Sequence, residues 1–141
     1  MVVVVAGVII AGFYLAGSPQ QARMERFDQR RIQNLEAIAG GIYAFYTQEQ
    51  DMSKRKLPKN LNELKNTIYL HGELHDPEAD IPYEYRVLTQ NSYELCATFS
   101  TSNKVAGRQR NYYGYQQRRW QHDAGRICFQ RQADQLPVYE D

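Results

Sequence analysis

The first fifty residues, MVVVVAGVIIAGFYLAGSPQQARMERFDQRRIQNLEAIAGGIYAFYTQEQ (Met1–Gln50), decide the fold. Met1–Ala16 contains no charged residue, and about 20 apolar residues are needed to cross the core of a bilayer. A cleaved signal peptide and a buried core helix are the alternatives, but a signal peptide carries basic residues first, and none precedes Arg23. We expect residues 1–17 to be a membrane anchor, which a helical continuation through Gly17–Ala22 would lengthen.

An amphipathic stem helix is predicted over residues 18–50. Ser18 suits the N-cap and Pro19 the first helical position; the alternative is a kink at Pro19 within one continuous helix. Steps of three and four residues place six side chains, five of them apolar, on one face: Phe27, Arg31, Leu35, Ile38, Ile42 and Phe45. The opposite face is mostly polar, with Arg26, Arg30, Gln33, Glu36 and Ala37.

Residues 51–132 are predicted to form a small head, and residues 133–141 a loosely ordered tail. A short helix is expected within Leu57–Leu64, with Asn60 and Glu63 as a capping box. Alternating apolar positions predict three strands: Tyr83–Leu88, Tyr93–Ser100 and Arg126–Arg131. The fold class is therefore α+β, with a long N-terminal helix, transmembrane and then amphipathic, packed on a small antiparallel sheet.

The two cysteines, Cys96 and Cys128, are expected on the sheet face opposite Leu95 and Ile127. A cross-strand disulfide is feasible if their Cα atoms come within about 7 Å. The alternative is a pair of buried free thiols in a reducing compartment. Because His122 is the only base near either cysteine in sequence, and no catalytic or phosphate-binding motif occurs, we expect no enzyme activity and no cofactor.

Residues 71–80 hold several potential metal ligands. Asp76, Glu78 and Asp80 could offer oxygen atoms to calcium, but their spacing lacks the EF-hand pattern. A histidine pair four residues apart would need a helix, which Gly72 and Pro77 disfavour. We therefore expect a solvated acidic turn and no bound metal.

The segment Arg108–Trp120 mixes cations with aromatic rings. Six of its side chains are candidates for an interaction surface: Tyr112, Tyr113, Tyr115, Arg118, Arg119 and Trp120. The interpretations are a loop packed over the sheet, a protein interface and a surface for nucleic acid. Nucleic acid is not expected as a partner, because no binding motif is present and the net charge is only +1.

A further pattern involves a short helix and the hairpin that follows. Leu57-Pro58, Leu61 and Leu64 are followed by Asp76-Pro77, by Pro82-Tyr83 with Tyr85, and by Tyr93-Glu94-Leu95. This order resembles type IV pilins and the major pseudopilins of secretion systems. The resemblance covers residues 26–99 and implies a subunit of a filament. The family also carries a Glu four residues after a Phe that follows its leader, whereas Phe13 is followed by Gly at position 17. Residues 93–99 and 120–129 also resemble the C-terminal part of uncharacterised bacterial membrane proteins.

The expected function is that of a membrane-anchored structural or interaction protein, a pilin-like or pseudopilin-like subunit. The alternatives are an accessory single-pass subunit of a larger membrane complex, and a ligand- or polymer-binding head in which Arg118, Arg119 and Trp120 are exposed. Membrane lipid and other protein subunits are the expected partners. Arginines after the apolar run favour a cytoplasmic head, but the disulfide and the resemblance favour the outside, which we expect.

Overall fold

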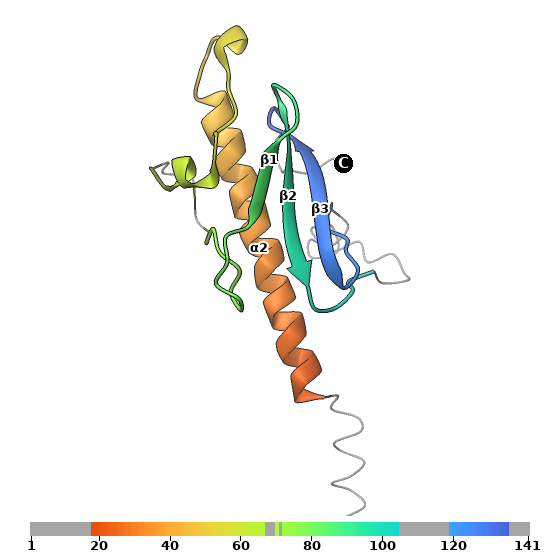
Figure 1. The fold of residues 1–141 in the computed structure, drawn as a ribbon. Helices are drawn as coiled ribbons and strands as arrows, with labels where there is room; N and C mark the ends of the chain where they lie inside the picture. Colours follow the sequence, from red (N-terminus) through yellow and green to blue (C-terminus); the bar gives the residue numbers. More distant parts are fainter. Residues whose placement is uncertain (1–17, 67–69, 71, 105–118, 136–141) are drawn as a thin grey trace, which may run out of the picture.

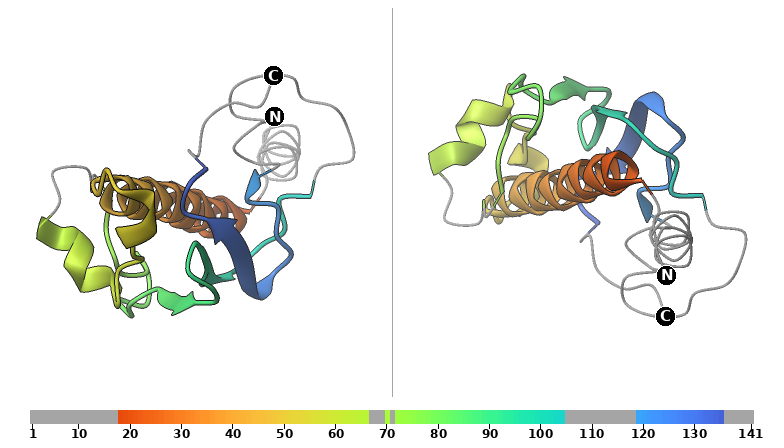
Figure 2. Two further views of the ribbon diagram at one scale, coloured as in Figure 1. Left: turned by 90° about the horizontal axis from the view of Figure 1, so that it is seen from above. Right: turned by 90° about the horizontal axis from the view of Figure 1, so that it is seen from below.

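The protein, seen in a computed structural model, is described over residues 18–66, 70, 72–104 and 119–135. In this part of the chain a long helix lies against one face of a three-stranded antiparallel sheet (Figures 1 and 2). The elements are α2 (Pro19–Thr47), η1 (Met52–Lys54), η2 (Leu61–Asn66), β1 (Glu84–Val87), β2 (Ser92–Phe99) and β3 (Gly125–Gln132). The predicted α+β architecture, a helix on a small antiparallel sheet, is confirmed.

Helix α2 begins at Pro19, directly after Ser18, whose backbone is extended. The proline has no N–H to leave unpaired, and its fixed φ suits the first helical turn. The Ser18 side chain makes no capping hydrogen bond, but its carbonyl accepts from the Ala22 N–H at 3.2 Å. On the predicted inner face Arg31, Leu35, Ile38 and Ile42 are buried, and Phe27 and Phe45 are half-buried. The three- and four-residue spacing of apolar side chains therefore predicted the buried face of the helix correctly.

The sheet has the order β1-β2-β3, with both neighbouring pairs antiparallel. A tight turn joins β1 to β2, where the Leu88 N–H donates to the Ser92 carbonyl at 2.9 Å. Alternate residues of β2 point toward α2 and are buried, as predicted: Tyr93, Leu95, Ala97 and Phe99. All three predicted strands are present, and each end lies one residue from its predicted position.

One hydrophobic core fills the space between helix and sheet. Its fully buried side chains include Leu35, Ile38 and Ile42 from α2, Leu64 from η2, and Tyr93 and Leu95 from β2. Trp120 and Phe129 extend this core, with their rings edge to face at a centroid distance of 4.9 Å. Ala133 is also buried, and its N–H donates to the Asn91 carbonyl at 2.7 Å. Ordered packing thus continues past residue 132, and residues 136–141 lie outside the description.

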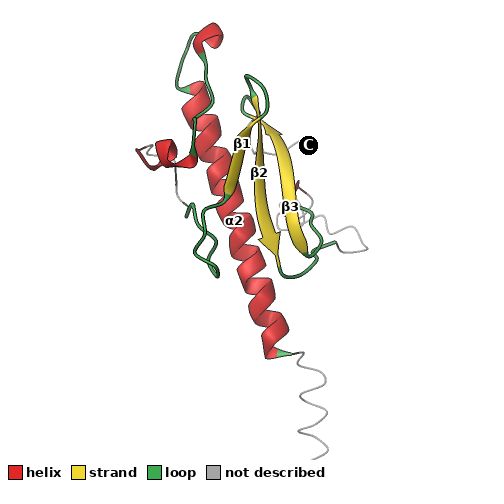
Figure 3. Ribbon diagram, in the orientation of Figure 1, coloured by secondary structure: helices red, strands yellow, loops and turns green. Residues whose placement is uncertain are grey.

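The short helix expected within Leu57–Leu64 is a 3-10 helix, η2, that begins only at Leu61 (Figure 3). The capping residues act, but on other partners than predicted. Asn60 accepts from the Asn62 N–H at 3.0 Å, and the Glu63 carboxylate accepts from the Lys59 N–H at 3.0 Å.

The predicted single-pass membrane location, with the head outside the cytoplasm, is corrected. Among the helices of the described residues, none combines the length and the apolar character that crossing a bilayer requires. Helix α2 has the length, but charged and amide side chains cover its outer face. The segment from which the anchor was predicted, residues 1–17, lies outside the described part of the chain.

The loop before β1 lies very close to α2 at one position. A methyl group added to Gly72 would lie 2.5 Å from the Cβ of Ala37, well inside van der Waals contact. Only a residue without Cβ lets the two backbones approach this far. The contact brings residues 72–83 onto the helix, next to the polar cluster described below.

Candidate functional site

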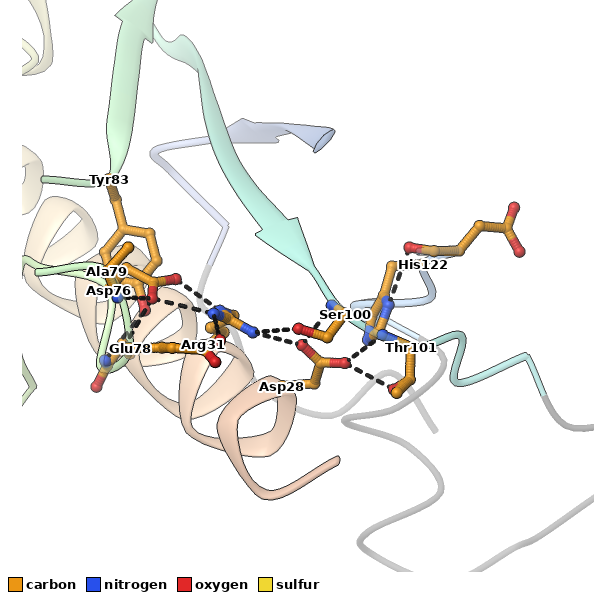
Figure 4. Close-up of polar contacts among 11 residues, drawn as sticks. Asp28, Arg31, Asp76, Glu78, Ala79, Tyr83, Ser100, Thr101 and His122 are labelled. Carbon is orange, nitrogen blue, oxygen red and sulfur yellow. Dashed lines mark hydrogen bonds and ion pairs between the residues drawn. The ribbon is translucent and has the colours of Figure 1, made fainter. Parts of the chain in front are cut away.

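Arg31 is the centre of a buried polar cluster that joins three segments of the chain (Figure 4). It lies on α2, and its side chain is only 5% exposed. Its Nε and Nη2 donate to Asp76 at 2.6 and 3.0 Å, which makes a two-bond ion pair with the loop before β1. Nη2 also donates to Glu78 at 2.9 Å, and Nη1 donates to Asp28 at 2.8 Å. One cation therefore meets three carboxylates.

Asp28, three residues before Arg31 on α2, links the cluster to the end of β2. Its carboxylate accepts from the backbone N–H of Ser100 at 2.9 Å and from that of Thr101 at 2.7 Å. The Thr101 hydroxyl donates to it as well, at 2.6 Å. Asp28 is 3% exposed, so these bonds replace the water that the carboxylate would have outside the protein.

The protonation equilibria reflect these contacts. Burial would raise the pKa of Asp28, but the hydrogen bonds from Thr101, Ser100 and Arg31 outweigh it, and the pKa is lowered. Burial would also raise the pKa of Asp76, but hydrogen bonds from Arg31 and two backbone amides bring that pKa below its ordinary value. Burial would lower the pKa of Arg31, but its three carboxylate partners raise it. The cluster is therefore held in its charged form.

The three residues considered as metal ligands have different surroundings. Asp76 is occupied by Arg31, and its Oδ1 also accepts from the backbone N–H groups of Glu78 and Ala79, both at 2.9 Å. Glu78 is half-exposed and bonds to Arg31. Asp80 is exposed, with a positive φ of 53° at the turn. The structure thus uses Asp76 and Glu78 as partners of an arginine within a turn that packs on α2.

One feature of the sequence is a signal for this cluster. Arg31 occupies the one charged position on an otherwise apolar helix face. A guanidinium on such a face must either leave it or find buried acceptors. Asp28, one turn earlier, was a visible candidate for an acceptor. The participation of Asp76, 45 residues away, follows only from the way in which the loop returns to the helix.

His122 lies beside the same cluster and is almost fully buried, with 1% exposure. Its ring stacks on Phe99 at a centroid distance of 3.6 Å and an interplanar angle of 12°. Nδ1 lies 3.3 Å from the Asp123 carbonyl, and Nε2 has no hydrogen-bond partner within the described part of the chain. Burial lowers the pKa of His122, because the charged imidazolium would lose its water.

Cys96 and Cys128 form the predicted disulfide. They occupy directly opposite positions on β2 and β3, with Cα atoms 4.0 Å apart. The bond lies on the outer face of the sheet, where Arg126 of β3 makes two hydrogen bonds to Glu84 of β1 at 2.8 and 2.6 Å. Nη2 of Arg126 also lies 3.6 Å from the Cys96 sulfur. This exposed ion pair therefore lies over the disulfide that links β2 and β3 covalently.

The structure describes two residues of the aromatic and cationic segment, Arg119 and Trp120. Trp120 is fully buried, and its indole N–H donates to Glu36 of α2. This position agrees with the interpretation of a loop packed over the sheet and contradicts the alternative of a ligand-binding head, which required Trp120 to be exposed. Arg131 covers the ring, with its guanidinium carbon 4.6 Å from the centroid. Arg119 is half-exposed, and its carbonyl accepts from Arg131 at 2.5 Å. The other candidates, Tyr112, Tyr113, Tyr115 and Arg118, lie outside the described residues.

The first turns of α2 are the most open part of the described helix. Residues 18–23 are all exposed, and α2 extends past the end of the sheet there (Figure 1). Arg23 lies over the ring of Phe27, with its guanidinium carbon 5.5 Å from the centroid, and Gln21 donates to Glu25 at 3.0 Å. Burial begins at Asp28, where the polar cluster starts. The cluster thus joins α2 to the head close to the point at which these exposed turns end.

Comparison with known proteins identifies no relative. No protein-family model matches the sequence, and no curated protein or solved structure has significant similarity to the chain.

Proposed function

We propose that the protein is a pilin-like structural subunit that assembles through protein–protein contacts of helix α2. The observation that carries the proposal is the projection of the first turns of α2 beyond the sheet, with residues 18–23 exposed. A helical end that leaves its own domain at a defined angle is available to a neighbouring copy. The resemblance to pilins suggests the kind of subunit. It rests on the order of Leu57-Pro58, Leu61, Leu64 and the hairpin.

Rigidity of the connection between helix and head supports this role. Arg31 and Asp28 tie α2 both to the loop at Asp76 and to the end of β2 at Ser100 and Thr101. Buried ion pairs contribute little net stability, but they can select one geometry. A subunit of an ordered array needs its contact surfaces at fixed relative positions. The cluster meets this need without any catalytic step.

The test uses the full chain. Negative-stain imaging and analytical ultracentrifugation over a range of protein concentrations should detect ordered assemblies. The variant R23E/R26E reverses two charges on the projecting turns and should weaken assembly. The variant K54E/K65E reverses two charges on exposed side chains of the head and serves as the matched control.

Three outcomes distinguish the possibilities. Assemblies that are lost in R23E/R26E and kept in K54E/K65E support the proposal. A chain that remains a monomer at every concentration contradicts it. Discrete particles that contain other proteins, isolated from the native source, would instead support the alternative of an accessory subunit of a larger complex.

A further inference from the structure

A groove of about 410 Å³ lies between the segment after η1 and the end of β1. Its lining combines three cations, Arg55, Lys56 and Lys59, with an apolar part formed by Leu57, Pro58 and Val87. No carboxylate is among the lining residues. The groove is on the head, and its lining shares no residue with the projecting turns of α2 on which the proposed function rests.

Two of the three cations of the groove are available. In the described part of the chain, neither Lys56 nor Lys59 takes part in an ion pair, and both are exposed. Arg55 is committed to the fold, because its Nε donates to the Glu49 carbonyl at 2.9 Å and its guanidinium lies over the Tyr46 ring. The ammonium groups of Lys56 and Lys59 therefore carry positive charge that no carboxylate of the described residues neutralises in an ion pair.

The apolar part is open to solvent mainly at Val87, since Leu57 is half-buried and Pro58 is buried. Val87 is 45% exposed at the end of β1, which is an edge strand among the described strands, and Leu88 beside it is 37% exposed. A large aliphatic side chain left open at a sheet edge is the kind of surface that proteins usually cover or charge. Here it lies next to cations that a partner could neutralise.

We propose that this groove binds an acidic peptide segment of a partner protein, with its carboxylates at Lys56 and Lys59 and an aliphatic side chain against Leu57 and Val87. The positive charge of the groove favours a negatively charged partner, because complementary charges guide association. The described lining contains no aromatic ring on which a base could stack, so a single-stranded nucleic acid fits less well. The inference goes beyond assembly through α2, and it stands or fails independently of it.

The probes are two fluorescein-labelled hexapeptides, (Glu-Leu)3 and (Gln-Leu)3, and a labelled oligothymidylate of ten nucleotides. Fluorescence anisotropy with the full chain at low salt should show saturable binding of (Glu-Leu)3. The variant K56Q/K59Q should weaken it about fivefold, as expected for the loss of two exposed ion pairs, and added salt should weaken it too. The variant R26Q/K65Q makes the same change of charge outside the groove and should bind like the unmodified chain.

A second variant tests the apolar part. V87D places a carboxylate in the groove and should repel (Glu-Leu)3, and thermal unfolding would confirm that the variant is folded. Any of four results would overturn the inference: no saturable binding of (Glu-Leu)3, equal binding of (Gln-Leu)3, an equal loss in R26Q/K65Q, or tighter binding of the oligonucleotide in competition. None of these results depends on whether the chain forms filaments.

Discussion

Arg31 of α2 and Asp76 of the loop before β1 are joined by two hydrogen bonds of 2.6 and 3.0 Å, 45 residues apart in sequence. Both side chains are less than 10% exposed. The pair holds the loop, the helix and, through Asp28, the end of β2 in one arrangement.

Replacement of Arg31 should be among the most damaging single changes in the protein. Arg31→Met keeps much of the side-chain volume but leaves Asp28 and Asp76 buried without their cation. We expect a loss of about 3–5 kcal/mol in the free energy of unfolding, as is typical when one partner of a buried ion pair is removed. Urea denaturation would measure it. The double variant R31M/D76N should lose less than the sum of the single changes, and strict additivity would contradict the proposed coupling.

Acid should weaken the fold through Asp28 and Asp76. Both have a folded-state pKa below the ordinary value of 3.8, so the unfolded chain binds more protons as the pH falls. Their contribution is therefore complete above about pH 4 and is lost as the pH decreases through the lower folded-state pKa. Thermal unfolding between pH 7 and pH 2 would show the loss. D28N should be less stable at pH 7 and should lose less on acidification; an unchanged acid profile in D28N would refute this assignment.

His122 should produce a separate pH effect in a milder range. Burial lowers its folded-state pKa below the ordinary value of 6.5, so stability is complete above about pH 6.5 and decreases as the pH falls from there toward the folded-state pKa. The measurement is the free energy of unfolding at pH 7.5 and 5.5. His122→Phe keeps a ring to stack on Phe99 and should abolish the difference. If H122F shows the same decrease, another group is responsible.

Two glycines should respond in opposite ways to alanine. Gly72→Ala places a methyl group 2.5 Å from the Cβ of Ala37 and should cost about 1–3 kcal/mol through overpacking. Gly40 lies within α2 and has nothing within 4 Å of an added Cβ, so Gly40→Ala should gain up to about 1 kcal/mol from helix propensity. Denaturant titrations of both variants provide the comparison. The double variant G72A/A37G should recover part of the loss if the contact with Ala37 is its cause.

Reduction of the disulfide between Cys96 and Cys128 should destabilise the head. The bridge closes a separation of 32 residues, and its removal should cost about 2–4 kcal/mol, mainly because the unfolded chain gains freedom. Denaturation with and without a phosphine reductant measures the cost. The variant C96A/C128A is the control, since its stability should not respond to the reductant. A response of equal size in the variant would show that the reductant acts elsewhere.

Local patterns in the sequence were sufficient for the secondary structure around the core. The three- and four-residue spacing of Leu35, Ile38 and Ile42 selects a helix face, and the alternation of Tyr93, Leu95 and Phe99 selects a sheet face, because each period matches the geometry of one regular backbone. Placement of the two cysteines on the same, outer sheet face made the disulfide feasible. These inferences require no knowledge of how distant segments meet.

The sequence by itself determined the three strands and their inner faces, favoured a helix start at Pro19 and made the pairing of Cys96 with Cys128 feasible. Only the tertiary structure decided that Asp76 and Glu78 bind Arg31, that Trp120 is buried against Glu36, and that Gly72 touches Ala37. Each of these contacts joins residues 35 or more positions apart, so no local period encodes it. The physical reason is that a charge or a large ring needs a partner when it is buried, and which partner it finds depends on the path of the whole chain.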